Sequence, residues 1–129
     1  MDARAFYSTV AERSMLSKEE AADLTRAVLE TVAMRVSAGE VRDLARQLPE
    51  PLAEAIRRKG KGPERFDLTE LIRRVSKRTG LNEAETTAGV RAVLLTLREA
   101  VDRKEFNDFM SQLPAEFARL LESSAQATD

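Results

Sequence analysis

Apolar residues recur every three or four positions over most of the chain, the spacing that places them on one face of an α-helix. The clearest stripes run through residues 21–36 and 90–101. Each stripe follows a short polar residue with a Glu three positions later, in Ser17-x-x-Glu20 and Asn82-x-x-Glu85. This pattern is typical of a capping box, in which both side chains bond free N–H groups at a helix start. No stretch alternates apolar and polar residues as a half-buried strand would, so the sequence predicts an all-α fold.

The segments after the two long stripes carry further helix-start signals. Ser37-x-x-Glu40 and Asp102-x-x-Glu105 repeat the cap pattern and predict a third helix in each half. Pro49 and Pro114 suit the first position of a fourth helix, where the missing N–H costs nothing.

Short helices are expected at the opening of each half, through Phe6 and Val10 in the first and after Asp67 in the second. Leu29 and Leu95 add apolar surface on other faces of the two long helices. A helix that is apolar on several faces is normally covered on several sides. The two long helices should therefore lie at the centre of the molecule.

The chain repeats itself at an offset of 65 residues, because residues 6–57 align without a gap on 71–122 and 16 of the 52 pairs are identical. The densest matches are Arg26-Ala27-Val28-Leu29-x-Thr31 on Arg91-Ala92-Val93-Leu94-x-Thr96 and Gln47-Leu48-Pro49 on Gln112-Leu113-Pro114. Internal repeats indicate repeated supersecondary units. We therefore expect a helical bundle made of two four-helix repeats related by a pseudo-two-fold axis.

A length of 129 residues suits a single domain. We expect one helical domain over residues 1–122, with repeat one at about 6–57, a basic linker at 58–66 and repeat two at about 67–122. Lys59-Gly60-Lys61-Gly62-Pro63 has the composition of a flexible joint. Residues 123–129 lack periodic apolar positions and are expected to form a flexible tail.

The duplicated unit, with its capped long helix, its Arg-Ala-Val-Leu segment and its Gln-Leu-Pro turn, resembles the bacterial domain-of-unknown-function family 2267. The resemblance covers about residues 6–121. It implies an all-helical bundle and supplies no activity, cofactor or catalytic residue. The chain departs from the pattern at Met15, where the second half has the more usual Gly80.

The composition excludes several kinds of chemistry, because the chain has no His and no Cys. Imidazole bases, His or Cys metal ligands, thiol nucleophiles and disulfides are all absent. Carboxylates are the remaining acid–base groups, and two sets lie at the starts of the long helices: Glu19, Glu20 and Asp23, and Glu83 and Glu85. Carboxylates are favoured there by cap bonds and the helix dipole, so we interpret both sets as structural. We predict no catalytic residue, cofactor or metal site.

Polar residues that are identical in the two halves indicate one structural role needed twice. Arg26 and Arg91 lie in the most apolar segments, so we expect each to be partly buried and paired with an Asp of a third helix. Breaking a buried pair is costly, so Arg26→Ala should lower the melting temperature sharply. The residues assigned such structural roles are Arg26, Arg91, Asp43, Asp108, Gln47, Gln112, Pro49 and Pro114, and Glu40 and Glu105 are also shared.

The net charge of −1 conceals a polarised chain, with +6 in residues 57–78 and −7 in the rest. Most of the basic side chains on the helix after Asp67 should face outward, where an anionic partner could bind. Interleaved aromatic residues, which favour nucleic acid, are missing apart from Phe66. The candidate residues for an anionic partner are Arg57, Arg58, Lys59, Lys61, Arg65, Arg73, Arg74, Lys77 and Arg78.

These observations favour a non-enzymatic protein-interaction or scaffold module with an unknown partner or with self-association. One alternative is nucleic-acid or other polyanion binding through the basic face of residues 57–78. A second is small-ligand binding in an apolar cavity between the repeats. The start of the chain lacks the basic and apolar regions of a signal peptide, and no stretch is long enough to span a membrane, so a cytoplasmic location is expected.

Overall fold

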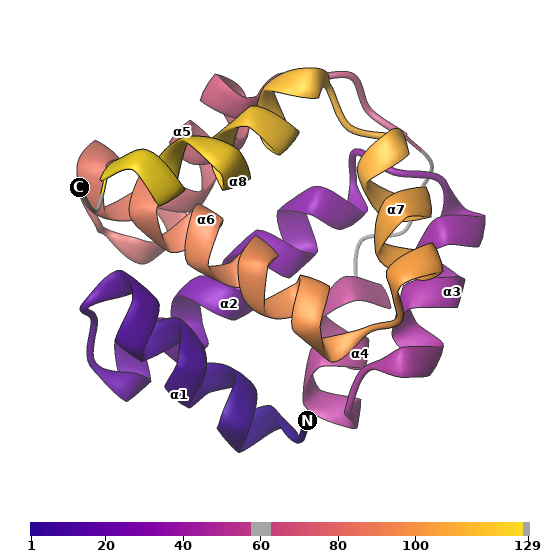
Figure 1. The fold of residues 1–129 in the computed structure, drawn as a ribbon, viewed down its shortest axis with the longest axis horizontal. Helices are drawn as coiled ribbons and strands as arrows, with labels where there is room; N and C mark the ends of the chain where they lie inside the picture. The colour runs from indigo at the N-terminus through magenta and orange to yellow at the C-terminus, as the bar shows by residue number, and fades with distance from the viewer. Residues whose placement is uncertain (58–62, 128–129) are drawn as a thin grey trace.

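The computed structural model describes residues 1–57 and 63–127, with side chains as far as Glu122. All regular structure in these residues is helical, so the predicted all-α class is confirmed (Figure 1). The helices are α1 (Ala3–Ser14), α2 (Lys18–Ala33), α3 (Ala38–Gln47), α4 (Glu50–Arg57), α5 (Leu68–Thr79), α6 (Glu83–Ala100), α7 (Arg103–Ser111) and α8 (Ala115–Ala127).

The two long helices, α2 with 16 residues and α6 with 18, lie at the centre of the bundle (Figure 1). Leu24 and Leu29 on α2, and Val90 and Leu94 on α6, are fully buried. Buried residues occupy every face of the second half of α2. The predicted central position of the two long helices is confirmed.

The first helix of each half contacts the long helix of the other half. α1 packs against α6, and α5 packs against α2. Arg13 at the end of α1 donates hydrogen bonds to Thr96 and Glu99 on α6. Arg78, at the matching place in α5, forms an ion pair with Glu30 of α2. Each long helix is therefore covered in part by a helix of the other half, while the pseudo-two-fold relation itself stays a prediction.

The helix-start signals of the two long helices are confirmed in detail. The side chains of Ser17 and Asn82 each accept a hydrogen bond from the N–H of the Glu three positions later. In turn, the carboxylates of Glu20 and Glu85 accept a hydrogen bond from the backbone N–H of Ser17 and Asn82. The prediction that Pro49 and Pro114 occupy the first helical position is wrong by one residue, because α4 and α8 begin at the residue after each proline. The proline carbonyls accept the first helical hydrogen bonds.

The turns after α1 and α5 have the same backbone conformation, although Met15 ends one helix and Gly80 the other. Met15 ends α1 at φ 62°, and Gly80 ends α5 at φ 80°, both in the left-handed region. Gly reaches this region without strain, whereas a residue with a Cβ pays a steric cost. The departure at Met15 therefore leaves the turn intact.

The boundaries of the predicted linker and tail are tested only in part. Pro63 to Asp67 are non-helical, and Glu64 donates its N–H to the Met34 carbonyl at 2.7 Å. The flexible joint predicted at 59–63 lies outside the described residues apart from Pro63. α8 continues into the predicted tail as far as Ala127, and residues 128–129 lie outside the described chain. Among the described residues, no helix combines the length and apolar composition that a membrane crossing requires.

The predicted burial of Arg26 and its pairing with Asp43 are wrong. The Arg26 side chain is 47% exposed and pairs with Asp23, one turn back in α2, at 3.2 Å. Asp43 pairs with Arg46 and Asp108 with Lys104, each within its own helix. Arg91 is half-buried, and its Nε has no hydrogen-bond partner. Repetition in the sequence indicated a shared role but could not show which way these side chains point.

The crossing of α2 and α6 depends on unequal residues at one repeat position. Leu24 and Gly89 align with each other in the two halves, and here they are in contact. A Cβ built on Gly89 would lie 2.4 Å from Leu24 Cδ2 and 2.9 Å from Cδ1. Because Leu24 is fully buried, it has little room to yield.

We predict that Gly89→Ala lowers the free energy of unfolding by about 1–2 kcal/mol, since overpacking outweighs the gain in helix propensity. Gly39→Ala is the matched control, because its nearest atom would be 3.7 Å away. Urea unfolding measures both, and because Leu24→Ala removes the clash, the double variant should lose less stability than the sum of the losses in Gly89→Ala and Leu24→Ala. Equal stability of Gly89→Ala and wild type would contradict the close contact.

The corrected position of Arg26 changes the expectation for its removal. Arg26→Ala should alter the free energy of unfolding by no more than about 1 kcal/mol, because an exposed ion pair within one helix contributes little. Thermal unfolding followed by circular dichroism provides the measurement. A fall of more than roughly 10 °C would show that the guanidinium has a buried role after all.

Candidate functional site

The basic face predicted at residues 57–78 lies on the end of α4, the segment before α5, and α5 itself. Arg58, Lys59 and Lys61 are outside the described residues. Arg65 and Lys77 are exposed, and the described part of the chain gives them no ion pair. The other four basic residues, Arg57, Arg73, Arg74 and Arg78, are each paired with a carboxylate.

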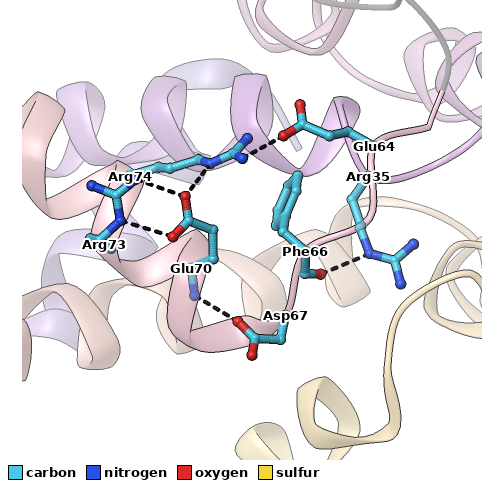
Figure 2. Close-up of polar contacts among 7 residues, drawn as sticks. All are labelled: Arg35, Glu64, Phe66, Asp67, Glu70, Arg73 and Arg74. Atoms are coloured by element: carbon cyan, nitrogen blue, oxygen red, sulfur yellow. Dashed lines mark hydrogen bonds and ion pairs between the residues drawn. The ribbon is translucent and has the colours of Figure 1, made fainter.

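Glu70 is the centre of the largest of these ion-pair networks (Figure 2). Arg73 donates two hydrogen bonds to its carboxylate, each 2.8 Å long, and Arg74 donates a third at 2.8 Å. These bonds, from Arg73 first and then Arg74, lower the pKa of Glu70 to about 2. Arg74 also pairs with Glu64.

The same network holds the segment before α5 in place. The Arg74 guanidinium lies 4.3 Å from the centre of the Phe66 ring. Arg35, at the end of α2, donates from Nε to the Phe66 carbonyl at 2.9 Å (Figure 2). Asp67 caps α5 by accepting the Glu70 N–H at 2.9 Å. Arg73 and Arg74 therefore have structural partners, and much of the predicted positive charge is neutralised locally.

Arg78 is 44% exposed, as predicted for the basic face, but it also has a partner that was not predicted. Its guanidinium turns across the helix interface to Glu30 of α2, whose side chain is only 4% exposed. A carboxylate at this depth requires a cation or several donors. The repeat offered the signal, because Arg13 occupies the same position and also reaches the opposite long helix.

A groove of about 440 Å³ runs along the outer face of α5 to the first turn of α6. Its α5 residues follow the helical spacing of one face, and they are joined by one residue of α6: Thr69, Ile72, Arg73, Ser76, Lys77 and Glu83. It lies within the second half of the chain. A cavity between the halves, of about 280 Å³, is lined mainly by polar groups such as Asp23, Arg26 and Arg78. It is not the apolar cavity that the small-ligand alternative requires.

The third helices begin with a different arrangement of caps from the long helices. Gln112 accepts the Ser37 N–H at 2.7 Å, and Gln47 accepts the Asp102 N–H at 2.8 Å. Each glutamine therefore bonds the cap N–H of the third helix in the other half. In a capping box that N–H would bond the Glu three positions later. The return bond predicted for Glu40 and Glu105 is wrong, because a glutamine from the other half takes its place.

Glu40 and Glu105, released from that role, meet between α3 and α7 (Figure 1 shows these helices side by side). One carboxylate oxygen from each of Glu40, Asp43 and Glu105 lies within 4.8 Å of the other two. Glu40 is 5% exposed. Oε2 of Glu40 and Oε2 of Glu105 are buried, and no N–H or hydroxyl group of the described residues donates to either. Asp108 is near enough to act on Glu40 electrostatically.

The electrostatics of this carboxylate cluster are unfavourable for a second buried charge. Burial, then a hydrogen bond with Glu105, and then the charges of Glu105, Asp43 and Asp108 raise the pKa of Glu40 to about 8. The neighbouring cations serve only the outer carboxylates. Arg46 lies 3.3 Å from Asp43, and Lys104 lies 3.0 Å from Asp108. The inner pair is thus arranged to hold a proton or a cation.

Sequence reasoning missed this cluster, although a signal was present. Glu-x-x-Asp occurs at 40–43 and again at 105–108, exactly one repeat apart, and i, i+3 residues share a helix face. Identity between the two halves indicates only a role that is needed twice, and the local pattern does not show that the two pairs meet. The carboxylates at the starts of the long helices agree with their structural interpretation, since Glu20 and Glu85 complete capping boxes.

Two comparisons with known proteins bear on this chain. The model of the family described as an uncharacterised conserved protein, DUF2267, matches residues 3–120. No curated protein matches the chain.

We predict that, in metal-free buffer, Glu40 reduces stability as the pH rises. The folded state keeps its proton up to about pH 8, whereas an ordinary Glu loses it near 4.5, so the folded state binds more protons in that window. The free energy of unfolding should therefore fall from about pH 4.5 to about pH 8 and level off above.

Glu40→Gln should abolish that contribution. Its melting temperature should exceed that of wild type by roughly 5 °C at pH 8, and the two should converge towards pH 4.5. Glu20→Gln is the control, because its carboxylate is exposed in a capping box. A constant difference between Glu40→Gln and wild type at every pH would contradict the assignment.

Proposed function

Since the chain belongs to the DUF2267 family, whose members are described only as uncharacterised and conserved, we propose its function from its own surfaces. It acts as a non-enzymatic protein-interaction module that binds an acidic segment of a partner in the groove along α5. The observation that carries the proposal is the groove itself, in which half-buried Ile72 lies near exposed Lys77, a lysine to which the described residues give no ion pair.

The composition of the groove supports a peptide-like partner. Ile72 is half-buried and offers an apolar contact, while Thr69 and Ser76 offer hydroxyl groups. Lys77 is exposed, and the described residues give it no ion pair. An acidic side chain beside an apolar one would match both features, because complementary charge guides the encounter and apolar burial adds affinity.

The available acid–base groups support a role without catalysis. The chain has no His and no Cys. The carboxyl whose pKa is raised to about 8, Glu40, is 5% exposed. A general base must come within hydrogen-bond distance of a substrate proton, and this depth leaves little surface for one.

The ion pairs of the basic face favour a protein partner over a polyanion. Nucleic-acid binding depends on cations that are free to replace counterions on successive phosphates. Arg57, Arg73, Arg74 and Arg78 are paired with Glu50, Glu70, Glu64 and Glu30, so a phosphate backbone would have to displace a carboxylate from each of them.

A displayed library of random peptides tests the proposal with a defined probe. Selection on the wild-type protein should enrich peptides that place Asp or Glu beside Leu, Ile or Phe. Lys77→Glu should weaken the selected peptides at least roughly tenfold, since it replaces attraction with like-charge repulsion. Lys18→Glu is the matched control, because Lys18 is an exposed lysine on the first turn of α2.

Titration calorimetry of one selected peptide against wild type, Lys77→Glu and Lys18→Glu gives the comparison. Unchanged affinity for Lys77→Glu, or equal weakening by Lys18→Glu, would show that the groove is not the binding surface. Failure to enrich any acidic peptide would oppose the proposed partner chemistry.

A further inference from the structure

The geometry points to a binding site for a hard divalent cation between α3 and α7, with carboxylate oxygens of Glu40, Asp43 and Glu105 as ligands. This inference is independent of the proposed function, because the groove lies on α5 and α6. It concerns residues that come together only in the folded chain.

The spacing of the oxygens fits a single ion. One carboxylate oxygen from each residue lies within 4.8 Å of the other two. Oxygen ligands bind Ca²⁺ at about 2.3–2.6 Å, so two ligands of one ion can be separated by up to about 5 Å. All-oxygen donor sets of this kind suit Ca²⁺, Mg²⁺ and Mn²⁺ rather than softer metals.

A separate observation indicates that the cluster is built for a ligand. Glu40 is 5% exposed, and no N–H or hydroxyl group of the described residues donates to its Oε2. The buried Oε2 of Glu105 likewise receives no such donor. Buried polar groups are normally hydrogen-bonded, so an exception indicates a bound ligand, an ion or a functional role.

Within residues 1–57 and 63–122, no basic side chain forms an ion pair with Glu40 or Glu105. Arg46 and Lys104 reach Asp43 and Asp108, and their side chains are 75% and 88% exposed. Each is anchored on its own helix and engages the outer carboxylate. Asp43 is itself exposed and Glu105 half-exposed, so an ion could enter from solvent and keep part of its water shell.

The capping pattern explains why two glutamates are available here. Glu20 and Glu85 occupy the same position in their helices, and each is held by the cap N–H. At α3 and α7 those N–H groups bond Gln112 and Gln47. The glutamines thereby release Glu40 and Glu105 to face each other.

A proton shared by the two glutamates is the competing explanation, and manganese distinguishes the two. Titrating Mn²⁺ into the protein at pH 8 should diminish the electron paramagnetic resonance signal of free Mn²⁺, with one site per chain. Dissociation constants of carboxylate sites reach from roughly 10⁻⁵ to 10⁻³ M. Addition of 10 mM CaCl₂ should raise the melting temperature by roughly 5 °C relative to NaCl of equal ionic strength.

The variants Glu40→Gln and Glu105→Gln keep the shape of the side chain and remove the charge that a cation needs. Each should weaken Mn²⁺ binding at least tenfold and abolish the Ca²⁺-dependent rise in melting temperature. Glu20→Gln, on a carboxylate held in a capping box, should bind Mn²⁺ as wild type does. Both Gln variants are expected to fold, since each relieves like-charge repulsion.

Two results would overturn the assignment. If wild type leaves the free Mn²⁺ signal unchanged up to 1 mM protein, the pair holds a proton only. If wild type and both Gln variants bind Mn²⁺ equally, the ion occupies exposed carboxylates elsewhere.

Discussion

The junction of the two halves depends on glutamines that complete the starts of the third helices. Ser37 and Asp102 each begin a third helix there, and a glutamine from the opposite half accepts the N–H of each. The first N–H groups of a helix have no carbonyl partner within the helix itself, so such a side chain is a natural acceptor. The exchange of glutamines therefore ties α3 to the end of α7 and α7 to the end of α3.

This exchange has an electrostatic consequence. The glutamates that would otherwise complete the caps are left facing each other, with Glu40 buried beside Glu105 and Asp43. On α5, by contrast, the acidic and basic groups neutralise one another through Glu70. Ion pairs thus neutralise much of the basic face, which is prominent in the sequence. The carboxylate cluster between α3 and α7, which is not prominent in the sequence, is left uncompensated.

The centre of the molecule follows the same principle of exchange between halves. α1 and α5 each cover the long helix of the other half, and Arg13 and Arg78 reinforce these contacts. Where the two long helices meet, the large side chain of Leu24 lies against Gly89, which has no side chain. This pairing of a large and a small residue permits the close approach of α2 and α6.

The sequence by itself determined the helices, most of their caps and the core stripes, because these depend on residues three or four positions apart. Ser17 with Glu20 and Asn82 with Glu85 are examples in which the local pattern was sufficient. Only the tertiary structure decided the partners of the charged and amide side chains. Arg26 turned to a neighbour in its own helix, whereas Arg78 and Gln112 bonded residues 48 and 75 positions away. Local periodicity contains no information about such distant partners, so the carboxylate cluster between α3 and α7 became visible only once the helices were packed.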